Sequence, residues 1–497
     1  MYFLGIDLGS SSVKLSVFDA EQGNCIASVT MPESEMEINA PKFGWAEQDP
    51  ELWWQYTKEG IKALGAKHHV KLSRIKAIGI AYQMHGLVLT DANLKPIRPA
   101  IIWCDSRAAV YGSQAYQQIG EDYCQNTLLG SPGNFTAAKL KWVQEHQPEV
   151  LEKAAYMMLP GDFIAAKLSG IAQTTASGLS EATLWNFKEG RLANEIMEGM
   201  QLPVEIVPEI VPNFGEQAKI SHTVANELGF SDDVIISYRG GDQPNNALSL
   251  NTLQPGEIAT TAGTSAVIYA VSDKDTYDKQ NRVNTFLHIN NSEQKKRNGV
   301  MVCINGSGIL YQWLRKTLST SSSDLIAYEQ LNQLAQKAKP GSKGLRFYPF
   351  GNGVERIFNN KSASSGLEFL NFNMHHSEEL VRSACEGIVF ALNFGFDIMK
   401  DIGVSGKVVR AGKANLFLSP VFREIFVNTT NTSLELYNTS GAEGAARGAA
   451  YGAGYYASLN EAFSNLEKLN QLEPTKDLTE QYQEIYSHWK NHIKTDF

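Results

Sequence analysis

The sequence contains one short motif twice, about 250 residues apart, and this repeat restricts the possible fold more than any other feature. Residues 9–13, Gly-Ser-Ser-Ser-Val, recur as residues 263–267, Gly-Thr-Ser-Ala-Val. Both copies separate two runs of alternating, β-rich residues, which predicts a strand, a tight turn and a second strand. Because the spacing halves the chain of 497 residues, we expect two similar domains, residues 1–250 and 251–497, joined near residues 248–256.

The patterns between these turns indicate an α/β fold. Alternating apolar residues predict four strands in the N-terminal region, residues 2–7, 13–19, 25–31 and 75–82. Asp49-Pro50 predicts the start of a helix that continues over residues 51–64. A second helix is predicted over residues 135–146, with Leu140 and Val143 on the apolar face and Lys139, Lys141 and Glu145 largely elsewhere. Strands and helices alternate along the whole chain, as in α/β proteins.

Composition excludes several classes of protein. The chain is 43% hydrophobic and 20% charged, which is typical of a globular protein and not of a disordered one. A net charge of −9 without a long basic run disfavours binding to nucleic acid or to an anionic membrane. The five scattered cysteines predict no disulfide framework and no thiolate zinc site. The N-terminus carries no basic leader and no apolar run is long enough to span a bilayer, so we expect a soluble cytoplasmic protein.

The two glycine-hydroxyl turns are candidate phosphate sites. Consecutive backbone N–H groups and hydroxyls in such a turn suit phosphate oxygens. The candidates are Gly9, Ser10, Ser11 and Ser12 in the first turn and Gly263, Thr264 and Ser265 in the second. Asp7 could hold Mg²⁺ or its water beside the phosphates, and Lys14 adds positive charge. A single turn of this kind is more often a hairpin without a ligand, but two matching turns favour phosphate binding.

Polar residues also follow three other strand-like runs. Gln83, Met84 and His85 follow the run 75–82, Trp103 and Asp105 follow the run 100–102, and Asp242 follows Gly240-Gly241. Such side chains at strand ends suit a polyol, and Asp242 is a candidate general base. Taken alone, a histidine such as His85 is more often structural, and an aspartate after glycines is more often a turn or cap residue.

Taken in order, these motifs resemble the FGGY family of carbohydrate kinases. The motifs that carry the resemblance are residues 7–14, 83–86, 103–107, 135–143, 241–242 and 263–265. The resemblance covers nearly the whole chain. It implies two actin-like, ribonuclease H-like ATPase domains with a cleft between them, the N-terminal one binding the sugar and the C-terminal one ATP. Within the family, residues 83–86 and 45–50 are most similar to members that act on xylulose.

The resemblance also implies a role for each motif. Asp242 is the expected proton acceptor, and the sugar is expected at Gln83, Met84, His85, Trp103 and Asp105. Asp7 and Asp242 are expected at the Mg²⁺ ion. The nucleotide phosphates are expected to meet the two turns, Lys14, Gly412 and Asn415. The expected reaction is ATP-dependent phosphorylation of a ketopentose, D-xylulose to D-xylulose 5-phosphate, and a homodimer is one option for the assembly.

Three segments depart from the family pattern. Residues 176–181 read Ala-Ser-Gly-Leu-Ser-Glu where the family often has Ser-Asp-Ala, which bears on the identity of the sugar. Residues 240–246 read Gly-Gly-Asp-Gln-Pro-Asn-Asn in place of the usual Gly-Gly-Gly-Asp-Asn-Ala-Ala, which retains the aspartate. Residues 411–415 contain Lys413 where the family has a glycine-rich stretch, which affects the adenosine contacts.

Three alternative functions remain open at this point. A related kinase for another polyol (ribulose, glycerol or gluconate) would keep the phosphate motifs and differ at residues 83–85 and Trp103. An actin- or chaperone-like ATPase would share the fold without needing Asp242 or a sugar. A catalytically silent binding protein would bind the sugar and release no ADP.

Overall fold

The computed structural model describes residues 1–321 and 324–493 and contains two compact units. The first unit comprises Met1–Asn251, Phe286–Arg297 and Thr439–Leu466, and the second comprises the remaining residues. The first boundary lies next to the expected division at residue 250. However, two segments that this division places in the second half, Phe286–Arg297 and Thr439–Leu466, belong to the first unit.

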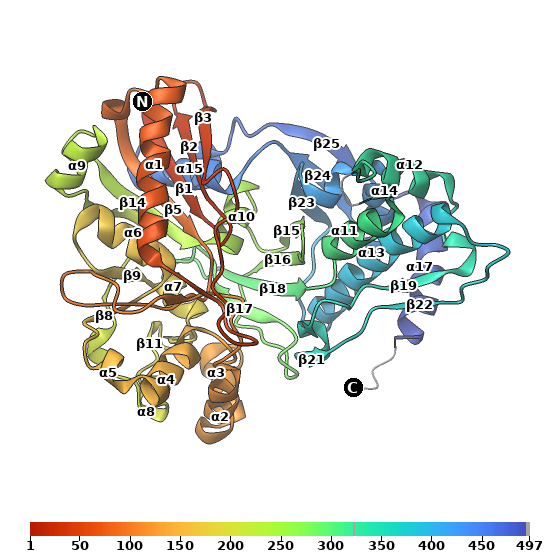
Figure 1. The fold of residues 1–497 in the computed structure, drawn as a ribbon, viewed down its shortest axis with the longest axis horizontal. Coiled ribbons are helices and arrows are strands. Elements are labelled where there is room, and N and C mark those ends of the chain that lie inside the picture. The colour runs from red at the N-terminus through yellow and green to blue at the C-terminus, as the bar shows by residue number, and fades with distance from the viewer. Residues whose placement is uncertain (322–323, 494–497) are drawn as a thin grey trace. The chain divides into compact units, whose positions relative to one another are not determined.

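The first unit is built on a six-stranded mixed sheet (Figure 1). In spatial order its strands are β13 (Phe214–Lys219), β14 (Ile235–Gly241), β5 (Ile75–Tyr82), β1 (Tyr2–Leu8), β2 (Val13–Asp19) and β3 (Asn24–Met31). The three N-terminal strands, all of them predicted, form an antiparallel meander, and β1, β5 and β14 run parallel to one another.

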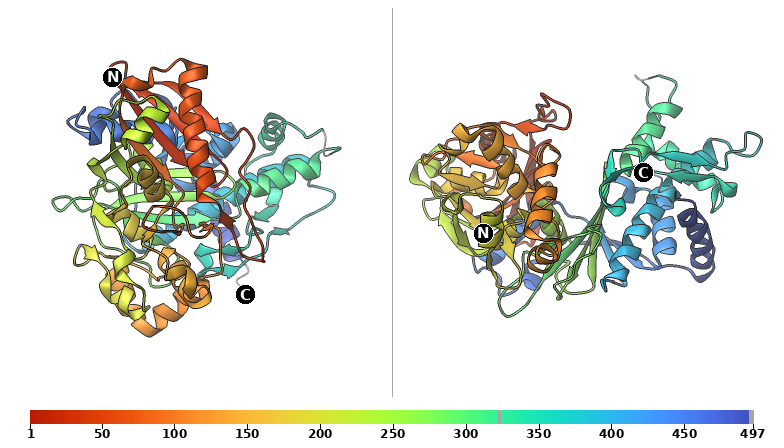
Figure 2. Two further views of the ribbon diagram at one scale, coloured as in Figure 1. Left: turned by 60° about the vertical axis from the view of Figure 1, so that its left-hand side comes forward. Right: turned by 90° about the horizontal axis from the view of Figure 1, so that it is seen from below.

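Helices cover both faces of this sheet. On one face, helix α1 (Pro50–His68) packs over β2 and β3, and its Trp53 shares a core with Leu4. On the other, helix α15 (Gly441–Gly452) packs over β1 and β5, with Ala446 beside Phe3. Successive strand residues point to opposite faces, so neighbours Phe3 and Leu4 contact different helices. Figure 1 shows α15 in blue among the red strands, and Figure 2 shows the red α1 from two further sides.

Small residues explain why Thr439–Leu466 joins the first unit. A Cβ on Gly5 would collide with the carbonyl oxygen of Ala442, and one on Gly79 would collide with that of Ala445. The backbone of α15 therefore rests directly on the strands, which is a close approach that only glycine permits. The sequence shows the small-residue helix but not the sheet against which it packs.

The remaining helices of the first unit surround its sheet or form an α-helical region beside it. They are α2 (Ala109–Ile119), α3 (Glu121–Leu128), α4 (Thr136–His146), α5 (Pro148–Leu151), α6 (Pro160–Ser169), α7 (Ala176–Glu181), α8 (Asn194–Gly199), α9 (His222–Leu228), α10 (Asp242–Ser249) and α16 (Leu459–Ala462). Helix α1 begins as predicted, because the Asp49 side chain accepts a hydrogen bond from the Glu51 N–H and Pro50 occupies the first turn.

The second unit repeats the topology of the first. Its sheet has the order β17 (Asn284–Leu287), β18 (Asn298–Ile304), β16 (Ala266–Ser272), β15 (Glu257–Ala262), β23 (Val408–Gly412), β24 (Ser433–Tyr437) and β25 (Lys468–Leu472). The hairpin β15–β16 corresponds to β1–β2, and in each sheet the first hairpin strand has a parallel neighbour, β23 or β5. The repeated motif thus marks the same hairpin turn in two similar sheets.

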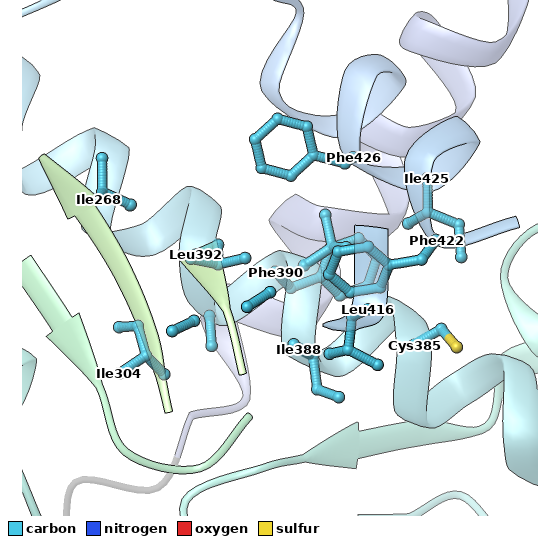
Figure 3. Packing of buried hydrophobic residues seen from close by; sticks show 14 of the residues in the cluster. Ile268, Ile304, Cys385, Ile388, Phe390, Leu392, Leu416, Phe422, Ile425 and Phe426 are labelled. Carbon is cyan, nitrogen blue, oxygen red and sulfur yellow. The ribbon is translucent and has the colours of Figure 1, made fainter. Parts of the chain in front are cut away.

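A single apolar core holds the second unit together (Figure 3). Its central helix is α13 (Ser377–Asp401), from which Phe390 and Leu392 extend into the core beside Ile268 of the sheet and Phe422 of α14 (Pro420–Thr430). The other helices are α11 (Gly308–Leu318), α12 (Tyr328–Lys337) and α17 (Lys476–Asn491).

Short two-stranded pairs complete the structure. They are β4 (Glu47–Gln48) with β7 (Ala100–Ile101), β6 (Val88–Thr90) with β8 (Tyr156–Met158), β9 (Gln173–Thr175) with β12 (Glu209–Val211), β10 (Trp185–Asn186) with β11 (Arg191–Leu192), β19 (Arg346–Tyr348) with β22 (Gly366–Glu368), and β20 (Val354–Glu355) with β21 (Lys361–Ser362). Across residues 1–321 and 324–493, no helix combines the length and apolarity that a membrane span requires.

Candidate active site

Three parallel strands of the first unit end at the same edge of the sheet. Leu8 of β1, Tyr82 of β5 and Gly241 of β14 lie side by side in register. The turn at residues 9–12, the segment Gln83–His85 and the side chain of Asp242 therefore all emerge at one edge. The carboxyl ends of parallel strands are the usual binding edge of α/β sheets.

Two carboxylates lie close together at this edge. Asp242 is the first residue of α10 and is partly buried. Burial, and after it the nearby Asp7 carboxylate, raise the pKa of Asp242 to about 7, and a hydrogen bond of 3.3 Å from the Gln243 amide opposes the rise. Burial also raises the pKa of Asp7, against the effect of Lys14, its partner across the β1–β2 pair. The structure thus brings together the two predicted acidic residues.

The N-terminus of α15, although distant in sequence, also lies beside this acidic pair. A Cβ on Gly441 would collide with Oδ2 of Asp7, and the Asn245 amide donates a 2.9 Å hydrogen bond to the Gly441 carbonyl. The motif analysis did not identify Gly441 or Asn245 as site residues. The small-residue run that begins at Gly441 is the only sequence signal for this contact.

His85 is held in an uncommon backbone conformation beside the acidic pair. Its φ is +62°, and its Nδ1 lies 2.9 Å from the Glu181 carbonyl oxygen. Its ring packs against those of Phe135 and Phe286, at 4.5 and 5.3 Å between centroids, and these two rings also contact each other at 6.0 Å. Motif reasoning missed Phe286, which belongs to the segment that joins the first unit from the second half of the sequence.

The two residues before His85 point into the protein. Gln83 and Met84 are buried, at 2% and 4% exposure. The Gln83 amide donates a hydrogen bond to Oε1 of Gln48 at 3.4 Å. Met84 packs against the backbone of Gly241 so closely that a Cβ on Gly241 would lie 2.6 Å from Cγ of Met84. Met84 therefore packs directly against the end of β14, next to Asp242.

The structure separates Trp103 from Asp105, which the sequence analysis had placed in one sugar-binding set. Trp103 is 49% exposed, and its indole N–H donates to Ser10 Oγ at 3.3 Å. Asp105 is fully buried and accepts hydrogen bonds from the Ala46 N–H at 2.6 Å and from Arg107 Nε at 2.8 Å. This geometry gives Asp105 a structural role, because a sugar could reach its carboxylate only by breaking these bonds.

The second unit contains a cavity of ≈ 550 Å³ beside its own glycine turn. Of the nucleotide residues predicted in the second unit, Gly263, Thr264 and Asn415 line it, whereas Ser265 and Gly412 do not. The motifs did not indicate the other lining residues, which are Ala262, Gly308, Ile309, Tyr311, Gln312, Tyr328, Glu329, Asn332, Gln333, Gln336, Leu416, Leu418, Ser419, Pro420 and Val421. The wall therefore combines amide side chains with apolar ones, as small-molecule sites do.

The glycine turn and the start of α11 are built as one piece. The Gly308 N–H donates to the Gly263 carbonyl at 2.9 Å, and the Ile309 N–H donates to that of Thr264 at 3.1 Å. The fully buried Glu355 carboxylate accepts the N–H groups of Asn305 and Gly306, at 3.0 and 2.9 Å, and so holds the preceding loop. Burial raises the pKa of Glu355 to about 7, against these hydrogen bonds. The sequence signal for this segment is the Asn-Gly-Ser-Gly run at 305–308.

Comparison with known proteins agrees with this arrangement. The chain matches the models of the FGGY family of carbohydrate kinases, the N-terminal domain over residues 2–249 and the C-terminal domain over residues 258–457. The chain belongs to the FGGY family. It is therefore a carbohydrate kinase, which confirms the resemblance and the enzyme class expected from the motifs. An FGGY relative, a xylulose kinase from Escherichia coli (strain K12), is 30% identical over 89% of this chain and 88% of its own length.

Solved structures confirm the expected two-domain α/β fold of FGGY kinases. A xylulose kinase from Rhodospirillum rubrum matches with a TM-score of 0.88 at 20% identity, covering 99% of this chain and 98% of that one. A Plasmodium falciparum glycerol kinase with ADP matches with a TM-score of 0.86 at 21% identity, covering 99% and 97%. Membership of the FGGY kinases implies ATP and a small-molecule sugar as substrates.

Proposed function

We propose that this FGGY kinase transfers the γ-phosphoryl group of ATP to D-xylulose and forms D-xylulose 5-phosphate. The observation that carries the proposal is the partly buried Asp242 carboxylate at the end of β14, with its pKa raised to about 7. An alkyl hydroxyl is a weak nucleophile, and a base with a pKa near the working pH is suited to accept its proton. The name of the E. coli relative supports xylulose as the acceptor.

We assign the sugar to the first unit. Among the candidate sugar-binding residues, His85 is partly exposed and Trp103 is well exposed. These two side chains can therefore contact a sugar directly. Gln83 and Met84 are buried behind them and would shape the site. The aromatic rings of Phe135 and Phe286 around His85 limit the directions in which its imidazole can turn.

We assign ATP to the second unit. The cavity beside Gly263 and Thr264 is large enough for a nucleoside and presents both amide and apolar groups. The Gly263–Ser265 turn supplies backbone N–H groups for phosphate oxygens. A second contact with the phosphates, at the first turn (residues 9–12), stays a prediction.

The two acidic residues fit a magnesium ion. Burial raises the pKa of both Asp7 and Asp242, so a nearby divalent cation would stabilise their ionised forms. Mg²⁺ usually binds one or two carboxylates together with substrate phosphates and water. The ion would offset phosphate charge during transfer, while Asp242 holds and deprotonates the sugar hydroxyl.

Substitution of Asp242 tests the proposal. Asp242→Ala should abolish ADP release with D-xylulose while the protein stays folded and binds ATP about as well as the wild type. Asp233→Ala is a matched control, because Asp233 is exposed and precedes the opposite end of β14. Turnover of Asp242→Ala within about tenfold of the wild type would exclude Asp242 as the base, since general-base catalysis contributes about 10²-fold or more.

One observation keeps an alternative function in view, namely phosphorylation of a polyol other than xylulose. The fold is shared with a glycerol kinase almost as closely as with a xylulose kinase, so the fold alone does not select the acceptor. His85→Ala should raise the KM for the true sugar, and an unchanged KM would move the sugar site elsewhere. ADP release without any sugar would instead indicate an actin-type ATPase.

The cytoplasmic location and the homodimer expected from the sequence stay predictions. Cell fractionation tests the first, and light scattering on the purified protein tests the second.

A further inference from the structure

Lys139 is buried, contrary to the polar face expected for it. Its side chain is 0% exposed and extends from helix α4 into the first unit. No carboxylate within residues 1–321 and 324–493 forms an ion pair with it. Its Nζ instead donates to two backbone carbonyls, that of His85 at 2.6 Å and that of Ile102 at 3.0 Å. A buried amine is unfavourable unless its hydrogen bonds are made, and here backbone oxygens make them.

The two carbonyls belong to the two loops that carry the sugar candidates. His85 ends the segment that follows β5, and Ile102 immediately precedes Trp103 after β7. These loops are separate in sequence, and the Lys139 ammonium group joins them. Disturbing Lys139 would therefore affect both loops at once.

The start of α4 holds the His85 segment at three points. The ring of Phe135, just before the helix, packs on the imidazole of His85. The Thr136 hydroxyl donates to the Gly86 carbonyl at 3.3 Å, and Lys139 donates to the carbonyl of His85 itself. A histidine with φ of +62° lies in a sparsely populated region, where a residue stays only when its surroundings impose the conformation. Lys139 is the only one of the three contacts that also reaches the second loop.

The protonation state of Lys139 does not decide this arrangement. Burial lowers the pKa of Lys139 to about 7, while the carboxylates of Asp105 and Glu181 oppose that change. An ammonium group has three N–H donors and a neutral amine has two, so either form can serve both carbonyls. Neither of these carboxylates lies within ion-pair distance, which leaves the backbone oxygens as the direct partners of Nζ.

We propose that Lys139 is a positioning residue of the sugar site, which joins the His85 loop to the Trp103 loop and fixes His85 in the conformation that receives the sugar. The inference rests on the proposed function of this site. It does not place Lys139 in contact with either substrate. It therefore predicts an effect on sugar binding that exceeds any effect on ATP binding.

The test compares full-length Lys139→Met with the wild type and with Lys141→Met. Lys141 lies two residues further along α4 and forms an ion pair of 2.7 Å with Glu145 near the surface, so its substitution is a matched control. Lys139→Gln is a second variant that keeps one amide donor. For each protein, kcat, the KM for D-xylulose, the KM for ATP and the melting temperature are measured.

Lys139→Met should raise the KM for D-xylulose about 10- to 100-fold, which corresponds to the loss of one or two hydrogen bonds to a charged donor. The KM for ATP should stay within about twofold, Lys139→Gln should be intermediate, and Lys141→Met should match the wild type. A folded Lys139→Met with an unchanged sugar KM, or equal rises in both KM values, would overturn the inference. Failure of both Lys139 variants to fold would also overturn it, in favour of a purely structural lysine. If neither the wild type nor Lys141→Met phosphorylates any sugar, the proposed function itself is refuted, whatever the Lys139 variants do.

Discussion

The pH dependence of the reaction follows from the position of Asp242. Its carboxyl group is partly buried beside Asp7, and its pKa is about 7. Asp242 must be ionised to accept the proton of the sugar, and a Mg²⁺ ion beside Asp7 and Asp242 would stabilise the ionised form. The value of kcat/KM for D-xylulose should therefore rise with pH, with a midpoint below pH 7, and level off at higher pH.

The same carboxyl group should make the protein less stable as the pH rises. The pKa of Asp242 in the folded chain, about 7, is above its ordinary value of 3.8, so the folded state binds the proton more tightly. The resulting stabilisation is complete below about pH 4 and is lost as the pH rises through 7, by up to about 4 kcal/mol. Asp242→Asn removes this loss, so the variant should melt at a higher temperature than the wild type at pH 8 while being nearly inactive.

Direct quantification of ADP, at saturating ATP and Mg²⁺, keeps the assay independent of coupling enzymes. Thermal melts at pH 5 and pH 8 on both proteins report the stability. A flat kcat/KM from pH 4 to pH 8, or an Asp242→Asn variant less stable than the wild type at pH 8, would refute the reasoning.

Three further predictions concern how the site is supported. Gly5→Ala should destabilise the first unit by about 3 kcal/mol, because its Cβ would collide with the backbone of α15; a melting temperature equal to that of Gly130→Ala, where a Cβ meets nothing within 4 Å, would argue against this contact. Asp105→Asn should lower stability by about 3 kcal/mol, because it leaves two buried arginines, Arg98 and Arg107, with the single carboxylate of Glu47, and denaturant titration should show the loss; unchanged stability with a raised sugar KM would restore Asp105 to the sugar site. Because the pKa of Glu355 is raised to about 7, the wild type should lose about 3 kcal/mol of stability as the pH rises from about 4.5 through 7. Glu355→Gln should not show this loss, and identical pH–stability curves for the two proteins would contradict the prediction.

Features encoded locally could be predicted from the sequence. The two hairpins around Gly9 and Gly263 form where alternation and turn residues predicted them, because neighbouring residues decide both features. The helix after Asp49-Pro50 begins at the predicted cap for the same reason. The ordered motifs also identified the family correctly, and all of them except residues 135–143, at the start of α4, lie at or just after a strand end.

Features that depend on distant contacts could not be predicted. Gly441 lies beside Asp7 although 434 residues separate them, and no local pattern records that contact. Asp105 has the residue type and position of a ligand-binding group, but its partners, among them Ala46, are set by the fold. Lys139 has the spacing of a surface residue, and only the loops packed over α4 make it internal.

The measurement that tests the central claim most directly is ADP release by the wild-type protein with D-xylulose, D-ribulose, L-ribulose, glycerol and gluconate, each against a reaction without sugar. The account predicts the highest kcat/KM with D-xylulose and negligible ADP release when no sugar is present. A higher kcat/KM with another acceptor would contradict the assignment to xylulose, and ADP release at the same rate without sugar would contradict the assignment of Asp242 as the base for a sugar hydroxyl.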